Sequence, residues 1–397
     1  MARLSYGRLV AILAARGGSL QEAEDALGDA LLRALGTWPR TGVPDSPEAW
    51  LLTAARRRWT DGKRGEAVAR RHRAHLALLE DERGEGAERP FGDDRLGLML
   101  ACAHPAIDAE VRAPLMLQAV LGLDARRIAS AFLVMPGTMG QRLSRAKLKI
   151  AAARIPFAVL PPEALEARLD DVLVAIYAAY SVGFDAVPAG DVKAAGLARE
   201  ALWLGGLVCE LLPDAAEAQG LRALMLFAEA RRPARQGADG RFMPLEAQDA
   251  SLWDAGLMAE AERALRAASR TLSLRRFQIE AAIQAAHSAR RQGGRTDWTA
   301  ILLLYEGLVR VSPTVGALTG RAVALAEVRG AAEGLAAIEA IDPDRRRSYQ
   351  PWWAARAHLA AAEGRTEMAI EAFDRAAGLS EDPGARAYLL ARRSGLP

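Results

Sequence analysis

The chain of 397 residues is poor in the residues that build metal centres and disulfide frameworks. Its two cysteines, Cys102 and Cys209, lie far apart, and neither belongs to a C-x-x-C pair. A disulfide framework and a zinc knuckle are therefore not expected. His104 lies near Cys102, but no second pair of ligands accompanies them, so a buried cysteine beside a helix-end histidine is favoured over a metal site. We expect neither a metal nor another cofactor.

Long apolar runs are also missing, although hydrophobic residues make up 51% of the chain. No uncharged apolar stretch reaches about 18 residues, the length that a membrane-spanning helix needs. The segment from Met1 to Val10 has no basic start followed by an apolar core, so it does not resemble a signal peptide. These observations predict a cytoplasmic protein that makes no contact with a membrane.

The sequence contains no recognisable motif of a catalytic site. The five histidines are scattered, and no glycine-rich phosphate loop follows a strand-like segment. No set of Ser, Cys and His recurs at the spacing of a catalytic site. We therefore do not expect an enzyme.

Alternating runs rich in Val, Ile and Thr, which would indicate strands, are missing as well. Ala, Leu, Arg and Glu dominate instead, and apolar residues recur at helical spacing almost everywhere. The sequence predicts an all-α protein, whose length allows two or three domains of about 150 residues.

Positive charge is concentrated near the N-terminus. Residues 1–155 hold 24 Lys and Arg against 18 Asp and Glu, whereas the remainder holds 28 against 31. Eight basic residues and two acidic ones lie between Ala54 and Arg73, and four basic residues with no acidic one lie between Gly137 and Ile150. Two separate basic segments suggest a polyanion that is contacted at two places.

Glycine, proline and charged segments divide this N-terminal part into two helix clusters. The first, residues 1–73, is predicted to contain helices near Tyr6–Arg16, Leu20–Leu35 and Pro47–Arg73. Ser46 before Pro47 suits a helix start, because serine caps helices and proline fits their first position. Residues 74–92 are charged and contain glycine, so they are predicted to form a linker.

The second cluster, residues 93–155, ends in a pattern typical of a helix-turn-helix, with helices over Ala125–Phe132 and Gly137–Ala152. One side of the second helix is apolar and is expected to pack inward. Arg pairs well with guanine and Gln with adenine in the major groove, so the other side could read DNA. An ordinary solvated basic face is the alternative. The residues on that side are Thr138, Gln141, Arg142, Arg145 and Lys149.

Residues 163–397 are predicted to form an extension of successive helices. A polar segment with Pro and Gly, Arg231–Asp254, interrupts its first half. Toward the C-terminus the spacing fits a tetratricopeptide unit, in which small residues let paired helices approach closely. The residues at the expected offsets are Trp353, Ala357, Gly364, Ala369, Phe373 and Ala376.

Four strings give the chain a resemblance to a known family, the extracytoplasmic-function sigma factors of the sigma-70 type, and to their branch with a C-terminal tetratricopeptide-like extension. The strings are AEDALGDALLRALGTWP, VPDSPEAWLLTAARRRWTDGKR, IASAFLVMPGTMGQRLSRAKLKI, and ARRPAR followed by PLEAQDASLWD. The resemblance covers essentially the whole chain. It implies two small helical sigma domains, the second a helix-turn-helix, followed by a helical-repeat extension.

The function that the resemblance implies is promoter recognition for RNA polymerase. The first cluster would dock on the clamp helices of the polymerase core and open the minus-10 element, and the second would bind the minus-35 element as duplex. Asp25 and Asp29, at i and i+4 of one helix, are candidates for the polymerase contact, although a solvated acidic face would look the same. The extension would regulate activity by binding a protein or a ligand.

Basic and aromatic side chains near the third helix of the first cluster suit unpaired DNA, because cations follow phosphates while a ring stacks on a base. Trp50 fits the core better. Trp59 fits a stacking platform and the core equally well. The resemblance also implies a base pocket in the loop before this helix. The candidates for the minus-10 element are Asp45, Ser46, Arg56, Arg57, Trp59, Lys63 and Arg64.

The chain departs from the family at two places. Gly28-Asp29 stands where members usually have Gln-Glu, and a glycine inside a helix costs about 1 kcal/mol relative to alanine. Residues 181–184 read Ser-Val-Gly-Phe, where many relatives have Asn-Glu-Gly-Tyr. The polymerase contact and any role of that Asn and Glu are therefore in doubt.

Two other functions are compatible with parts of the pattern. A free-standing helix-turn-helix regulator with a ligand- or protein-sensing repeat domain would bind a palindrome as a dimer, without polymerase. An enzyme or adaptor built on the extension would use Trp253, Asp254 and Glu260, or the stretch Arg231–Arg235, as a small-molecule site. The strings AEDALGDALLRAL and WLLTAARRRWTD argue against the regulator, and the residues of the small-molecule site also fit loop anchoring and helix capping.

Overall fold

The computed structural model is mainly helical in the part of the chain that it describes. The described residues are 2–17, 20–62, 94–153, 165–185, 192–237, 241–271, 274–290 and 295–397. In these ranges the only β-type pairing is an isolated bridge between Gln236 and Phe242, so the predicted all-α class is confirmed. The predicted linker, residues 74–92, lies outside them. None of the described helices is long and apolar enough to cross a membrane.

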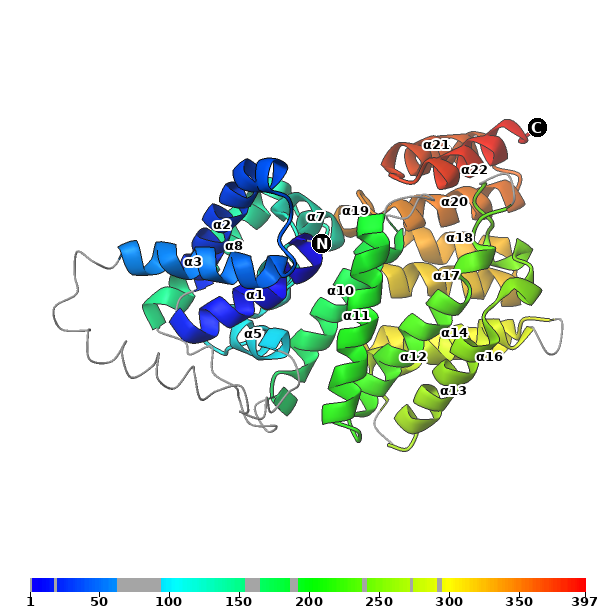
Figure 1. The fold of residues 1–397 in the computed structure, drawn as a ribbon. Coiled ribbons are helices and arrows are strands. Elements are labelled where there is room, and N and C mark those ends of the chain that lie inside the picture. The colour runs from blue at the N-terminus through cyan, green and yellow to red at the C-terminus, as the bar shows by residue number, and fades with distance from the viewer. Residues whose placement is uncertain are drawn as a thin grey trace. The chain divides into compact units, whose positions relative to one another are not determined.

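Two compact units divide the chain, Met1–Ala179 and Tyr180–Pro397. In the first, shown in blue to green in Figure 1, helices from both predicted clusters pack together. The helices of this unit are α1 (Ala2–Gly17), α2 (Leu20–Thr41), α3 (Pro47–Gly62), α5 (Asp94–Cys102), α6 (Ala109–Ala119), α7 (Ala125–Ala131) and α8 (Pro136–Ala153). A further helix, α10 (Leu169–Asp185), crosses the boundary between the units.

The second helix runs six residues past its predicted end at Leu35 and includes Pro39. Proline lacks an N–H and normally ends a helix, but here other hydrogen-bond donors stabilise the last turn. Arg40 donates to the carbonyl of Gly36 at 3.0 Å, and the amide of Gly42 donates to Trp38 at 2.9 Å. Gly42 then adopts a φ of 83°, a left-handed conformation that glycine tolerates, and the helix ends there.

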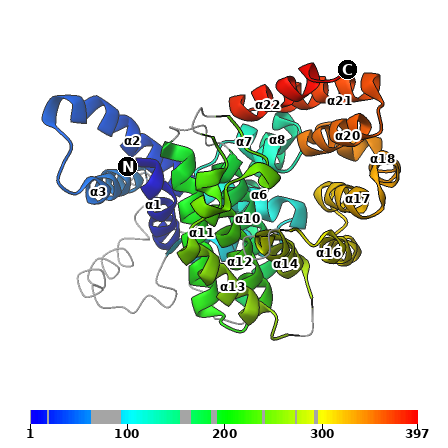
Figure 2. The same cartoon turned by 90° about the vertical axis from the view of Figure 1, so that its right-hand side faces the viewer.

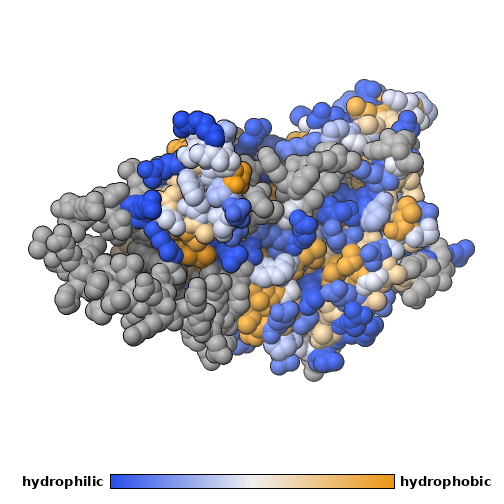
Figure 3. All heavy atoms as spheres, viewed as in Figure 1, coloured by the Kyte–Doolittle hydropathy of each residue, from blue (hydrophilic) through white to orange (hydrophobic). Residues whose placement is uncertain are grey.

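The second unit is a succession of helices that follow one another in a curved row from α14 to α22 (Figure 2). Hydrophilic side chains cover most of the described surface in Figure 3, with apolar patches between them, as expected for helices that bury one face. The helices are α11 (Val192–Leu211), α12 (Ala216–Ala230), α13 (Ala255–Ala268), α14 (Arg276–Ser288), α16 (Trp298–Val311), α17 (Val315–Arg329), α18 (Ala331–Glu339), α19 (Pro343–Arg346), α20 (Gln350–Ala362), α21 (Thr366–Leu379) and α22 (Pro383–Ser394).

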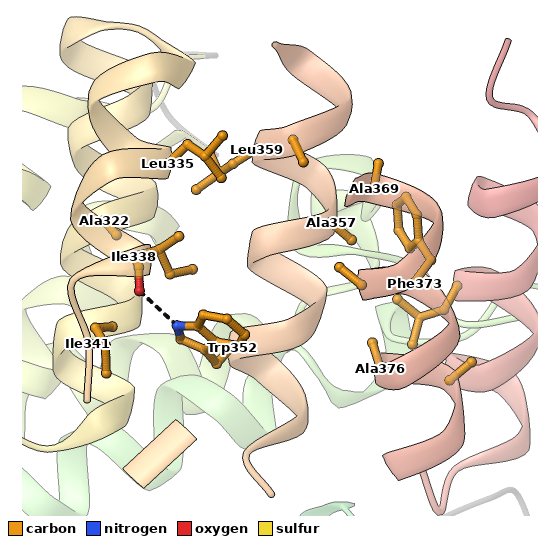
Figure 4. Packing of buried hydrophobic residues seen from close by; sticks show 14 residues of the cluster. Ala322, Leu335, Ile338, Ile341, Trp352, Ala357, Leu359, Ala369, Phe373 and Ala376 are labelled. Carbon is orange, nitrogen blue, oxygen red and sulfur yellow. Dashed lines mark hydrogen bonds between the residues drawn. The ribbon is translucent and has the colours of Figure 1, made fainter. Parts of the chain in front are cut away.

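A core of large side chains set against alanines holds the last helices together (Figure 4). Trp352 is 1% exposed and donates its indole N–H to the carbonyl of Ile338 at 3.0 Å, while Phe373 packs among the alanines of α20 and α21. The sequence template placed Trp353 in this position, but Trp353 is only partly buried. Gly334 allows close approach, because a Cβ there would lie 2.5 Å from that of Ala326.

His358 in α20 gives the second unit a predicted pH dependence. Burial against Phe373, with ring centroids 5.2 Å apart, and the nearby charge of Arg392 lower the pKa of His358 to about 4. Its ordinary pKa is 6.5, so the folded state favours the neutral ring. The stability that this contributes is complete above pH 6.5 and is lost as the pH falls from 6.5 toward 4, by at most about 1.4 kcal/mol per pH unit.

Urea denaturation of the full chain at several pH values between 7.5 and 4.5 measures this dependence. The variant His358→Gln should lose less stability than the wild type over that interval, because the amide does not titrate. Equal losses in the two proteins would contradict the assignment.

Candidate nucleic-acid interface

Helices α7 and α8 are joined by a tight turn whose geometry follows from its sequence. Asp124 caps α7 by accepting from the amide of Arg127 at 2.9 Å. The turn contains no glycine, and Leu133 adopts the left-handed conformation instead, with a φ of 53°. The amide of Val134 donates to Ala129 at 2.9 Å, which closes the turn. The two helices lie within one residue of the bounds that the sequence predicts for them.

The inner face of α8 is the predicted one. The apolar residues that the spacing assigned to it are all buried, and they hold the helix against the rest of the first unit. They are Met139, Leu143, Ala146 and Ile150. Three of the predicted DNA-facing residues, Thr138, Gln141 and Arg145, are exposed on the opposite side. The helix therefore presents a row of polar and basic groups, which is the requirement for contact with a major groove.

The other two predicted DNA-facing residues contact acidic side chains near the start of α6. Arg142 lies 3.4 Å from Glu110, and Lys149 lies 3.2 Å from Asp108. The carboxylates are 80% and 79% exposed, so the pairs are screened by solvent and contribute little to stability. These partners were missed in the sequence, because no local pattern links residues that are 32 and 41 positions apart.

Helix α3 carries the described part of the predicted minus-10 set. Arg57 is exposed and Arg56 is half-buried. In the loop before the helix, Asp45 and Ser46 are exposed, and the carbonyl of Ser46 accepts from Trp50 at 3.1 Å. The side chain of Trp59, together with Lys63 and Arg64, lies outside the described residues.

Trp50 is half-buried, and its main aromatic contact is with another tryptophan. Its ring packs edge-to-face against Trp38, with centroids 5.5 Å apart, and so ties α3 to the last turn of α2. In α2 itself, Asp25 is exposed and Asp29 is half-buried. Of the two residues predicted to contact the polymerase, Asp25 is therefore more accessible to a partner than Asp29.

Most of the residues that suggested a small-molecule site in the extension have structural partners, although the buried indole nitrogen of Trp253 and one guanidinium nitrogen of Arg231 have no hydrogen-bond partner. Asp254 caps α13 by accepting from the amide of Leu257 at 2.9 Å, and Glu260 pairs with Arg222 at 2.7 Å. Trp253 is buried beneath the guanidinium of Arg290, which lies 5.3 Å from its ring centroid. Arg232 binds Glu229 through two hydrogen bonds of 2.7 and 2.8 Å.

Comparison with known families identifies the N-terminal part. Residues 1–72, which include α1, α2 and α3, match the family Sigma-70 region 2. The N-terminal domain of the chain is a Sigma-70 region 2 domain. Helices α1, α2 and α3 all lie within this match.

Two further matches extend beyond this N-terminal domain. Residues 168–269 match a family of unknown function, DUF6596. The matched residues include the polar segment Arg231–Asp254. An uncharacterized protein of Rhizobium meliloti (strain 1021) is 37% identical over 379 residues, covering 94% of this chain and 89% of the relative. The chain belongs to the same family as that protein along nearly its whole length. No solved structure matches it.

Proposed function

We propose that the protein is a sigma factor of the extracytoplasmic-function type that directs RNA polymerase to specific promoters. The observation that carries this proposal is the combination of a Sigma-70 region 2 match over residues 1–72 with α8, whose inner face is buried and whose outer face presents Gln141 and Arg145. A region 2 domain alone would bind one promoter element. A second DNA-reading helix in the same chain provides a second contact, as a sigma factor requires.

The proposed roles follow the two clusters. Residues 1–73 bind the clamp helices of the polymerase core through Asp25 and Asp29 and hold the opened minus-10 element. Residues 93–155 bind the minus-35 element as duplex, and the side chains of α8 divide into base readers and phosphate contacts. The polymerase supplies the chemistry, so the chain itself needs no catalytic group.

We assign a regulatory role to the extension, residues 163–397. It makes up more than half of the chain. The residues that would form the small-molecule site of an enzyme, Trp253, Asp254 and Glu260, make structural contacts instead. A curved row of helices offers a surface for a protein or ligand. If a chain ending near residue 155 transcribes as well as the full-length protein with purified polymerase, this role is wrong.

The test of the proposed function is run-off transcription with purified core polymerase, the full-length protein and fragmented genomic DNA from the source organism. We expect discrete transcripts. Arg142→Ala should remove or weaken them, because losing a base contact costs about 1 to 3 kcal/mol and losing a phosphate contact weakens all sequences alike.

The matched control is Arg266→Ala in α13, an arginine that is 67% exposed and far from the region 2 match in sequence. It should leave the transcripts unchanged. A protein that neither co-elutes with core polymerase nor yields transcripts, but binds a palindrome as a dimer, would be a free-standing regulator instead.

A further inference from the structure

Arginine side chains gather in the second unit where the end of α12 lies against the last turns of α14, two helices that pack together (Figure 2). Arg231 and Arg232 follow α12 directly, Arg235 comes soon after them, and Arg290 follows α14. Glu229 accepts from Arg232 through both of its carboxylate oxygens. In the described part of the chain, neither Arg231 nor Arg290 has a carboxylate partner. Their positive charges are therefore not compensated by a side chain.

The guanidinium group of Arg231 is only half satisfied. Its Nη2 donates to the side-chain oxygen of Gln284 in α14, whereas its Nη1 is buried and has no hydrogen-bond partner. Burial and the charges of Arg235 and Arg290 lower the pKa of Arg231 to about 10, so the group still carries its charge at neutral pH. A buried charge is costly unless an opposite charge pairs with it.

The indole of Trp253 lies beside these guanidinium groups. It is 3% exposed, and the guanidinium of Arg290 lies 5.3 Å from its ring centroid. The amide of Asp254 donates to the carbonyl of Ala230 at 2.9 Å, which fixes the backbone of Trp253 next to that of Arg231. The Nε1 of the indole is also buried without a partner. An oxyanion would accept from such donors and compensate the charge, whereas a water molecule would accept without compensating it.

Arg290 connects this cluster to the polar segment of the extension. Its Nη1 donates to the carbonyl of Glu246 at 2.8 Å, and its Nη2 donates to those of Leu245 at 2.5 Å and Gln248 at 2.9 Å. All these acceptors are uncharged. A guanidinium binds a phosphate or a carboxylate through two parallel hydrogen bonds between opposite charges, which are stronger. An anion beside Trp253 would therefore compete with the carbonyls for Arg290.

We propose that Arg231, Arg290 and the indole of Trp253 form a binding site for an anion that carries a phosphate or a carboxylate group. The anion compensates the charge of Arg231 and accepts from the two unpaired donors. Because Arg290 also holds the polar segment, binding is coupled to the conformation of residues 245–248. A regulatory effect of this anion on transcription rests on the proposed function, whereas the binding itself does not.

The first test is calorimetric titration of the full-length protein with inorganic phosphate and, separately, with acetate, at an ionic strength kept constant with sodium chloride. We expect saturable binding of at least one of the two oxyanions, with one site per chain. Arg231→Met should weaken this binding about tenfold or more, because it removes the charge and an unpaired donor. The oxyanion that binds more tightly identifies the group as a phosphate or a carboxylate.

Arg222→Met is the matched control. Arg222 lies within α12 and is partly buried, but its guanidinium already pairs with Glu260 at 2.7 Å. The substitution removes the same charge as Arg231→Met and should leave oxyanion binding unchanged. Circular dichroism checks that both variants are folded.

A second variant locates the bound anion, and it replaces Arg231→Met if that protein does not fold. Trp253→Phe keeps an aromatic ring but removes the N–H, so it should also weaken binding. In protein labelled with nitrogen-15 tryptophan, the indole signal that Trp253→Phe lacks should shift when the wild type is titrated. The signal of Trp352, whose N–H already donates to Ile338 at 3.0 Å, should not shift.

The outcomes separate the two proposals. If neither oxyanion binds, or if Arg231→Met and Trp253→Phe bind as tightly as the wild type, the site is wrong. If the site is confirmed, run-off transcription with and without the bound oxyanion tests regulation, which requires a change in the wild type that Arg231→Met abolishes. A wild-type protein that binds the oxyanion but neither transcribes nor binds polymerase would contradict the proposed function and leave the site intact.

Discussion

Replacing Trp352 by alanine is expected to lower the free energy of unfolding of the C-terminal unit by about 3 to 5 kcal/mol, the usual loss for a large buried aromatic residue. The indole is 1% exposed and lies among the alanines and Ile338 of the core in Figure 4. The substitution opens a cavity and removes the indole that donates to the carbonyl of Ile338 at 3.0 Å, which keeps only the amide of Ile341 at 3.3 Å as a donor. Urea denaturation of the full-length protein, followed by circular dichroism, measures the change.

The neighbouring Trp353 is the matched control. Its indole donates to the carbonyl of Arg347 at 3.1 Å, and the ring is only partly buried. Trp353→Ala should therefore cost clearly less than Trp352→Ala. If the two substitutions have the same effect, or if Trp353→Ala has the larger one, the assignment of Trp352 to the core is wrong.

Replacing Glu217 by alanine is expected to cost about 2 to 4 kcal/mol, because it removes a buried helix cap. Glu217 lies in α12 and is 6% exposed. Its carboxylate accepts from the amides of Phe277 at 2.9 Å and Gln278 at 3.3 Å, in the first turn of α14. Alanine would leave both buried amides without this acceptor and would remove a negative charge that the N-terminus of α14 favours. Thermal unfolding of the full-length variant measures the loss.

Glu262→Ala is the control for this prediction. Glu262 is 49% exposed and pairs with Arg266 at 3.6 Å within α13, so its removal should change stability by less than about 0.5 kcal/mol. Similar losses for Glu217→Ala and Glu262→Ala would show that the contacts with α14 contribute nothing. Glu217→Gln should fall between them, because the amide oxygen still accepts but carries no charge.

Local periodicity was sufficient to predict the helices and the inner face of α8. Met139, Leu143, Ala146 and Ile150 recur at three and four residues, and that spacing alone places them on one side of a helix. It also placed Ala357 and Phe373 correctly in the core of the C-terminal unit. It chose Trp353 where the structure buries Trp352, because adjacent residues differ by about 100° around a helix and either can face the core at its edge. The end of α2 was missed for a different reason. Pro39 predicts a helix end, but the hydrogen bonds that Arg40 and Gly42 donate stabilise one more helical turn.

The sequence by itself determined the all-α class, the two basic segments and the polar row on α8, because each depends on composition or on neighbours within a few turns of one helix. Only the tertiary structure decided which charges meet. Glu24 and Lys147 are 123 positions apart, and Glu217 and Phe277 are 60 apart. Such pairs follow from how helices pack, and packing is set by the fit of many side chains at once, of which a single sequence carries no local trace.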